Sequence, residues 1–280
     1  MSDFFTEIVN LLATAQISSP RLETREIFAY VLHKNVSEIY SGCAVNDKEK
    51  QKIEEVVQKR INHCPLDKII GKKSFYKYDF FTNEYVLSPR PDTEILVEKA
   101  LDLLPNDSRA NILDLGTGSG CLVESILCER QGVQGWAVDI SFQALEVAKK
   151  NALNLHVMER LNFIQASWFE QNFLKNFPEA FQLIVSNPPY IPQNDISSLQ
   201  AEVKNYDPLL ALDGGESGYE SYKKIAEWMP MLLKDNAYVL LEAGIGQALS
   251  IAKIFEQNGL RLIEIVPDLS GIDRCVILQK

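Results

Sequence analysis

The sequence predicts an α/β protein built on a mostly parallel sheet, and three features of the chain point to this fold. Short apolar runs alternate with helical patterns from residue 112 to residue 279, as expected of a parallel sheet. A glycine-rich turn at residues 116–120 follows the first run, and an Asn-Pro-Pro-Tyr turn at residues 187–190 follows the fourth. Both turns therefore follow strands at the edge where open α/β sheets bind ligands.

The composition is that of an ordinary globular protein, and it argues against several classes of function. The 280 residues are 46% hydrophobic and carry a net charge of −10, so we expect no direct nucleic-acid binding. No apolar stretch approaches the ~20 residues that a membrane helix needs. Residues 1–7 include early acids and no basic segment, so we expect no signal peptide. Five cysteines without a Cys-x-x-Cys pair lead us to expect a cytoplasmic protein.

The cysteines and histidines show no metal-binding pattern. The five cysteines form no Cys-x-x-Cys pair, so we expect reduced, mostly buried thiols. None of the histidines, His33, His63 and His156, has another ligand type at metal-ligand spacing. A hydrolase elbow is also missing, because residues 215–218 lack the final glycine of Gly-x-Ser-x-Gly. We therefore expect no metal cofactor.

Residues 1–68 predict a small N-terminal helical domain. Ser19 with Pro20 predicts one helix start, and Asn46 with Glu49 predicts a capping box at another. The residues expected to face inward are Ile8, Leu11, Leu12, Ala15, Leu22, Ile27, Tyr30, Val31, Ile53, Val56, Val57 and Ile61. This domain shows no chemistry of its own, and either packing or gripping a partner protein remains open as its role.

Residues 69–90 predict a β-hairpin linker. Its strand-forming residues are Phe75, Tyr76, Tyr78, Phe80, Phe81, Tyr85 and Val86. Gly71 and Asn83 are the expected turn residues. After this linker, Asp92 or Thr93 is expected to cap a helix that carries Ile95, Leu96, Ala100 and Leu101.

Residues 91–280 predict the main domain, in which strands and helices alternate. We expect strands at 112–115, 136–139, 161–164, 181–185 and 237–243, and a closing hairpin of strands at 261–266 and 274–279. We expect helices at 121–127, around 144–148, at 219–233 and at 246–257.

The glycine loop and the acid after the next strand predict a nucleoside-type ligand. Glycine lacks a Cβ and lets a ligand approach the backbone. The spacing is Gly-x-Gly-x-Gly, unlike the Gly-x-Gly-x-x-Gly of dinucleotide sites, and the loop has no basic residue to meet a phosphate. Asp139 ends the second strand, 25 positions after Asp114 (139 − 114), and its carboxylate can accept from both ribose hydroxyls. This pattern favours an uncharged ribose and a positively charged sulfonium.

The Asn-Pro-Pro-Tyr turn predicts a site for a planar NH2 group. The side-chain oxygen of Asn187 and the carbonyl of Pro188 can accept both hydrogens, while Tyr190 can pack flat against the amide. The two prolines make the turn stiff. Because an amide nitrogen is a poor nucleophile, fixed acceptors that orient it and favour its developing positive charge would be catalytic.

These residues resemble a known family. The glycine loop, Asp139 and the Asn-Pro-Pro-Tyr turn resemble the seven-stranded, Rossmann-like class I methyltransferases that use S-adenosylmethionine. A narrower resemblance is to the peptide chain release factor glutamine N5-methyltransferases. It is carried by Gly71 and by the stretches at 65–66, 89–94 (Pro-Arg-Pro-Asp-Thr-Glu), 112–120 and 186–191. The similarity runs from about Pro65 to the C-terminus, and the stretch at 89–94 is its specific marker.

The resemblance implies a set of site residues. Those implied to hold S-adenosylmethionine, and its product S-adenosylhomocysteine, are Asp114, Gly116, Thr117, Gly118, Ser119, Gly120, Asp139, Ser167, Trp168 and Asn187. Those implied to hold the glutamine of a release factor's Gly-Gly-Gln motif are Arg90, Thr93, Asn187, Pro188, Pro189 and Tyr190, of which Asn187, Pro188 and Tyr190 are implied to be catalytic. Trp168 is expected to lie against the adenine.

Two positions depart from the family pattern. Ser167 stands where the family has Asp, so its hydroxyl can accept from the adenine amino group only without charge, and weaker cofactor binding is expected. Ser88 stands where the family has Ile, with no mechanistic consequence that we see.

Three other functions remain as alternatives. An N6-adenine DNA methyltransferase also binds a planar NH2 group, but it needs a basic groove that the net charge of −10 does not favour. A glutamine methyltransferase acting on a ribosomal protein is disfavoured by the stretch at 89–94. The third is a cofactor-binding scaffold without activity. We expect a monomer whose partners are release factors, with no membrane association.

Overall fold

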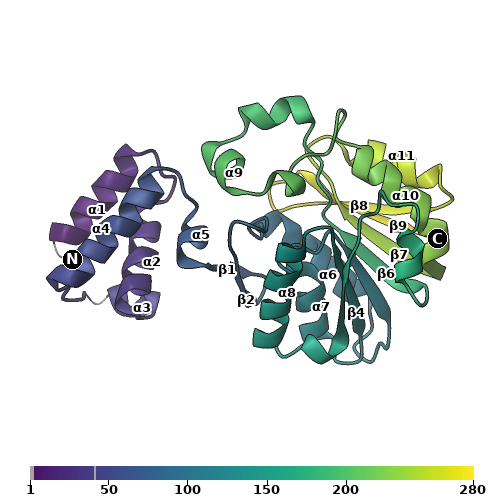
Figure 1. Cartoon of the computed structure of the whole chain (residues 1–280), viewed down its shortest axis with the longest axis horizontal. Helices are drawn as coiled ribbons and strands as arrows, with labels where there is room; N and C mark the ends of the chain where they lie inside the picture. Colours follow the sequence, from purple (N-terminus) through teal and green to yellow (C-terminus); the bar gives the residue numbers. More distant parts are fainter. Residues whose placement is uncertain (1–2, 41) are drawn as a thin grey trace. The chain divides into compact units, whose positions relative to one another are not determined.

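The computed structural model describes residues 3–40 and 42–280, which form two compact units (Figure 1). The first unit comprises Met1–Lys72 together with Gln200–Tyr206, and the second comprises Lys73–Leu199 and Asp207–Lys280. The division of the chain into three parts after residues 68 and 90 stays a prediction.

The first unit is helical. Its helices are α1 (Asp3–Thr14), α2 (Pro20–Leu32), α3 (Val36–Tyr40), α4 (Asp47–Ile61), α5 (Leu66–Ile70) and α9 (Ala201–Tyr206). The predicted capping box at the start of α4 is confirmed, because Glu49 N donates to Asn46 Oδ1 at 3.0 Å and Asn46 N donates to Glu49 Oε2 at 2.8 Å. The helix therefore starts where its sequence satisfies the first free N–H groups.

The core of the first unit is narrower than the helical spacing suggests. Ile8, Leu12, Ile27, Ile53 and Val57 are buried, as predicted. The inward orientation predicted for three residues is wrong, since the exposed fractions are 43% for Leu11, 48% for Leu22 and 41% for Tyr30. A small bundle can cover only one stripe of each helix, so apolar residues at the edge of that stripe stay in solvent.

Helix α9 is held in the first unit by a buried cation. The Arg60 guanidinium on α4 is almost fully buried, and its Nη2 lies 2.7 Å from Glu202 Oε1 and 3.2 Å from Glu23 Oε1. The Tyr206 hydroxyl also donates to the carbonyl of Asn62 at 3.0 Å. No pattern in the sequence of residues 200–206 predicts that they join the N-terminal helices.

A two-stranded hairpin of β1 (Lys72–Phe75) and β2 (Tyr78–Phe81) follows α5. The hairpin is confirmed, but its turn lies at Tyr76, which has a φ of 56°, and Tyr85 and Val86 lie outside the strands. Gly71, a predicted turn residue, lies in a turn that ends α5, where it has the left-handed conformation with a φ of 76°. Glycine is favoured at the end of a helix because, without a Cβ, it adopts the left-handed conformation without strain.

The second unit is organised around a seven-stranded sheet. Its strands are β3 (Asn111–Leu115), β4 (Gln134–Asp139), β5 (Leu161–Gln165), β6 (Phe181–Ser186), β7 (Leu233–Glu242), β8 (Arg261–Pro267) and β9 (Asp273–Gln279). The order is β5-β4-β3-β6-β7-β9-β8, in which β9 runs antiparallel to both neighbours and the other pairs are parallel. Each predicted strand is confirmed, although β7 begins four residues early (237 − 233) because Leu233 pairs with Phe181.

Helices cover both faces of this sheet (Figure 1). They are α6 (Glu94–Leu103), α7 (Cys121–Glu129), α8 (Phe142–Asn154), α10 (Glu220–Leu232) and α11 (Ala248–Glu256), with 3-10 turns η1 (Pro91–Thr93), η2 (Met158–Arg160), η3 (Phe173–Asn176), η4 (Gln193–Ser198) and η5 (Leu209–Ala211). Leu113 and Ile184 pack in the core formed with α10 and α11, whereas Ile112 and Leu183 pack with α6 and α7. The apolar strands are buried on both faces, as a parallel sheet requires.

Two further expectations concern the cysteines and the membrane. All five cysteines are free, but only Cys275 is buried, so the prediction of mostly buried thiols is wrong. Within residues 3–40 and 42–280, no helix has the length and apolar character to cross a membrane.

Candidate functional site

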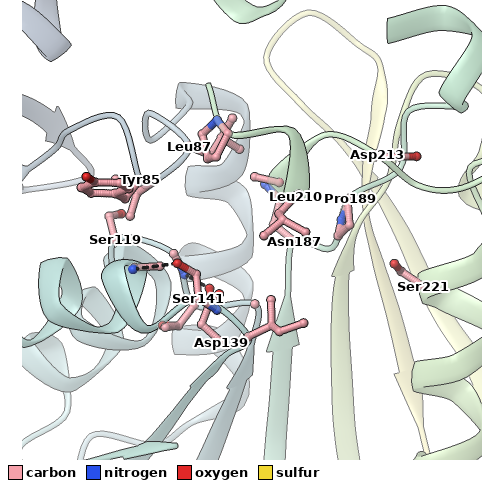
Figure 2. Close-up of a pocket in the computed structure, with 18 of the residues that line it drawn as sticks. Tyr85, Leu87, Ser119, Asp139, Ser141, Asn187, Pro189, Leu210, Asp213 and Ser221 are labelled. Atoms are coloured by element: carbon pink, nitrogen blue, oxygen red, sulfur yellow. Dashed lines mark hydrogen bonds between the residues drawn. The ribbon is translucent and has the colours of Figure 1, made fainter. Parts of the chain in front are cut away.

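The carboxyl ends of the central strands open into a cavity of about 620 Å³, which is within the range of small-molecule sites (Figure 2). The predicted site residues that line it are Arg90, Thr93, Gly116, Thr117, Gly118, Ser119, Asp139, Ser167, Trp168, Asn187 and Pro189. Figure 2 shows Asp139 and Asn187 at the ends of β4 and β6, on the same pocket. Parallel pairing of β3 with both β4 and β6 brings these strand ends together.

Four predicted site residues lie outside the cavity lining. Asp114 and Pro188 are buried, and Gly120 lies at the N-cap of α7. The hydroxyl of Tyr190 donates to Glu242 Oε1 at 3.4 Å. Direct contact of these four residues with a ligand stays a prediction.

The glycine loop is fixed by the backbone of the neighbouring strand. The N–H groups of Gly116 and Thr117 both donate to the carbonyl of Val138 at 2.9 Å. Gly116 has a φ of 76°, and a Cβ added there would lie 3.4 Å from Cη2 of Trp168. An L-residue at this position would be strained, and its side chain would fill the space above the loop.

Asp139 accepts two backbone hydrogen bonds and keeps capacity for more. Its Oδ2 accepts from Gly118 N and its Oδ1 accepts from Ser141 N, both at 2.9 Å. Burial raises the pKa of Asp139, and these N–H donors oppose the shift. Each carboxylate oxygen has a second lone pair, so Asp139 can accept from a pair of ligand hydroxyls.

Two buried carboxyl groups lie beneath the loop. Asp114 Oδ2 accepts from the Thr117 hydroxyl at 2.7 Å, whereas Asp114 Oδ1 and both carboxyl oxygens of Glu124 have no partner. Burial raises the pKa of Asp114 to about 7 and that of Glu124 well above its usual value. The titratable side chains beneath the loop are thus carboxyl groups, which give a phosphate no positive charge to bind, and this is compatible with a sulfonium cofactor.

Trp168 forms a flat wall beside the loop. Its carbonyl accepts from the indole N–H of Trp228 at 2.8 Å, while its own buried Nε1 has no partner. Ser167 Oγ already accepts from Phe169 N at 3.2 Å, so its hydroxyl hydrogen and one lone pair remain for a ligand. An aromatic wall with polar groups at its edge suits a nucleobase.

Asn187 connects to a buried acid that sequence reasoning missed. Asn187 Nδ2 donates to Thr93 Oγ1 at 3.3 Å, and the Thr93 hydroxyl donates to Glu242 Oε2. Thr93 holds the N-cap position of α6, as predicted, but its side chain makes no cap hydrogen bond there. The sequence did carry a signal for Glu242, because an acid at the end of a parallel strand lies at the ligand-binding edge.

Arg90 is also held by a residue that the sequence did not indicate. Its Nη2 lies 2.7 Å from Asp207 Oδ2, and Asp207 Oδ1 accepts from Ser88 N at 3.4 Å. Asp207 lies in an irregular segment, where spacing gives no information about its partner. The ion pair fixes Arg90 at the cavity wall.

No metal site accompanies this cavity in the part of the chain that the structure describes. Across residues 3–40 and 42–280, no group of three or more His, Cys, Asp or Glu residues is placed to hold a metal ion.

Two family profiles match the chain. One, described as the methyltransferase small domain, matches residues 91–205, and the other, described as the PrmC N-terminal domain, matches residues 3–71. Together they cover parts of both compact units.

Two curated relatives match more than nine-tenths of the chain. The release factor glutamine methyltransferase of Rhodospirillum rubrum is 37% identical over 271 residues, covering 96% of this chain and 82% of that protein. The bifunctional methyltransferase of Rickettsia felis is 36% identical over 292 residues, covering 94% of this chain and 55% of that protein. The chain therefore spans about half the length of the Rickettsia protein.

A solved structure supports the fold alone. The crystal structure of a methyltransferase from Pyrococcus furiosus matches with a TM-score of 0.54 and 18% identity, covering 80% of this chain and 97% of that one. With the strand order and the methyltransferase profile, this likeness confirms the predicted seven-stranded fold.

Proposed function

The chain belongs to the release factor glutamine methyltransferase family, and from this membership we propose its activity. It transfers a methyl group from S-adenosylmethionine to the side-chain amide nitrogen, N5, of the glutamine in the Gly-Gly-Gln motif of peptide chain release factors. The product cofactor is S-adenosylhomocysteine, and no metal takes part.

One observation carries this proposal. The glycine loop, Asp139 and Asn187 all border the same cavity of about 620 Å³. The residues proposed to hold the cofactor and the substrate thus line one cavity, which supports the transfer of a group between two bound molecules.

The residues divide into cofactor and substrate groups. Asp139 would accept from the ribose hydroxyls, Trp168 would lie against the adenine, and the loop at residues 116–120 would approach the rest of the cofactor. S-adenosylmethionine supplies, when bound, a methyl group activated by a positively charged sulfur.

The Asn187 turn would prepare the nucleophile. Asn187 Oδ1 and the Pro188 carbonyl would accept the two hydrogens of the glutamine amide, with Tyr190, Pro189, Arg90 and Thr93 bordering the same group. These acceptors hold the nitrogen in one orientation and favour the positive charge that develops as it attacks. The nitrogen loses its proton to water after the new N–C bond forms.

The mouth of the cavity suits a protein substrate. Five large side chains with exposed apolar surface line the cavity, namely Tyr85, Ile140, Phe169, Leu209 and Leu210. Exposed apolar surface around a pocket is typical of sites that meet another protein. No feature of the described residues favours adenine in DNA or a ribosomal-protein glutamine instead. The monomeric state, cytoplasmic location and absence of nucleic-acid binding stay predictions.

Mass spectrometry of a purified bacterial release factor tests the proposal. After incubation with this protein and S-adenosylmethionine, we expect one added methyl on the glutamine of the Gly-Gly-Gln motif. A release factor with that glutamine replaced by alanine is the control and should stay unmodified. Methylation at a residue other than that glutamine, or no methylation of the wild-type release factor, would contradict the proposed function.

A further inference from the structure

We infer that Glu242 and Thr93 are positioning residues that decide which end of the Asn187 amide faces the cavity. This inference rests on the proposed function, because it concerns the acceptor that Asn187 offers to the substrate amide. It assigns a role to Glu242, which lies two hydrogen bonds away from Asn187.

Asn187, Thr93 and Glu242 form a series of two hydrogen bonds at the edge of the sheet. Ser186 pairs with Leu241, so the next residues, Asn187 and Glu242, follow adjacent positions on β6 and β7. Glu242 and Thr93 are each only 3% exposed. Because solvent hardly reaches either side chain, little water competes for the hydrogen bonds that join Asn187, Thr93 and Glu242.

Donor and acceptor rules fix the direction of these hydrogen bonds. An ionised carboxylate can only accept, so the single hydrogen of the Thr93 hydroxyl goes to Glu242 Oε2. Thr93 Oγ1 can then only accept, so it must face the NH2 end of Asn187, which lies 3.3 Å away. The carbonyl end, Oδ1, is therefore left for the cavity that Asn187 lines.

The opposite orientation would disable the site. Oδ1 would face Thr93 Oγ1 without a hydrogen between the two oxygens, and the Asn187 NH2 would face the substrate NH2. Two donors cannot bond each other, so the substrate nitrogen would lose one of its two fixed acceptors.

The orientation depends on the charge of Glu242. Burial raises the pKa of Glu242 to about 7, the Thr93 hydroxyl and Arg274 oppose this shift, and Asp92 adds to it. The titratable and charged groups that face Glu242 from the surrounding elements are Asp92, Cys121, Tyr190, Tyr222, Arg274 and Cys275. A protonated Glu242 could donate to Thr93, whose own hydrogen would then point at Asn187 and draw Oδ1 toward it.

The first test uses substitutions at Thr93. Thr93→Val keeps the shape and removes the hydroxyl, and we expect kcat to fall roughly 100-fold, comparable to the loss of one preorganised partner. We expect the Kd for S-adenosylhomocysteine, measured by calorimetry, to stay within about twofold. Thr93→Ser should recover kcat to within about threefold of wild type. Thr24→Val, at another buried threonine, is the matched control and should leave kcat unchanged.

The second test uses pH. In the wild-type protein, kcat should fall as the pH drops below about 7. In Glu242→Gln, kcat should no longer fall over this pH range. The side-chain 15N resonance of Asn187, assigned by its loss in Asn187→Ala, should titrate with the same midpoint in wild type and remain flat in Glu242→Gln.

The outcomes separate this inference from the proposed function. If Thr93→Ser loses as much activity as Thr93→Val, or if cofactor affinity falls in parallel with kcat, the positioning role is wrong. If the Asn187 resonance does not titrate while release factor is methylated, the inference fails and the proposed function stands. If the resonance titrates but no release factor is methylated, the proposed function fails instead.

Discussion

The side-chain amide of Asn187 donates a hydrogen bond to the Thr93 hydroxyl at 3.3 Å, although 94 positions separate the two residues. Thr93 belongs to the Pro-Arg-Pro-Asp-Thr-Glu stretch, and Asn187 begins the Asn-Pro-Pro-Tyr turn. Two motifs that were recognised separately in the sequence therefore form one polar connection.

Asn187→Ala should abolish methyl transfer and leave cofactor binding nearly unchanged. The substitution removes an acceptor for the substrate amide, and we expect kcat to fall at least ~100-fold. Calorimetry with S-adenosylhomocysteine provides the second measurement. A collapse of cofactor affinity would show that our division between substrate and cofactor residues is wrong.

Asp139→Ala should raise the Kd for the cofactor. Losing a charged acceptor for the ribose hydroxyls costs ~1.5–3 kcal/mol, which is about a 10- to 150-fold change in Kd. Because Asp139 also accepts from Gly118 N and Ser141 N, Asp139→Asn is the control that keeps one acceptor oxygen. We expect an intermediate Kd for Asp139→Asn, and an unchanged Kd in Asp139→Ala would remove Asp139 from the site.

Glu124→Leu should stabilise the protein. Both carboxyl oxygens of Glu124 are buried without a partner, and removing such a group should raise the free energy of unfolding by ~1–3 kcal/mol at neutral pH. Urea denaturation of both proteins measures the difference. A variant less stable than wild type would indicate that a polar partner satisfies Glu124.

The stabilisation should depend on pH. The pKa of Glu124 is raised well above its ordinary value of 4.5, so the folded protein keeps a proton that the unfolded chain releases. The stability due to the neutral carboxyl is fully present below pH 4.5 and is lost as the pH rises toward the folded-state pKa. The gain in unfolding free energy of Glu124→Leu over wild type should therefore grow as the pH rises above 4.5, whereas a constant gap would contradict the buried, neutral carboxyl.

Arg60→Ala should loosen helix α9. The substitution removes the cation that separates the carboxylates of Glu23 and Glu202. We expect the free energy of unfolding to fall by about 1–3 kcal/mol, which is less than for a fully buried pair because Glu202 is partly exposed. Hydrogen exchange of residues 201–206 should rise well above its wild-type rate. Lys59→Ala, at an exposed position of the same helix, is the control, and equal exchange in both variants would contradict this role.

The positions of the strands along the chain could be predicted because each strand and its following helix are local patterns. The 116–120 loop and the 187–190 turn could be placed for the same reason, since glycine and proline mark turns within a few residues. Orientation within the small helical unit was harder, as the exposed Leu22 and Tyr30 show.

Partners that come from distant segments could not be predicted. Glu242 acts on Asn187 only because β7 lies next to β6, and strand order is not written in the local sequence. Asp207 reaches Arg90 from an irregular segment without any periodic pattern. Sequence reasoning thus identified the groups that carry chemistry and missed those that hold them in position.

The membership of residues 200–206 in the first unit has a practical consequence for dissecting the protein. The chain passes from one unit to the other at three points, after residues 72, 199 and 206. A truncation that begins at residue 73 would leave α9 without Arg60 and Asn62, its partners in the intact chain. The shortened product would carry an unanchored segment at residues 200–206, so its loss of activity would not by itself demonstrate that the N-terminal helices recognise the substrate.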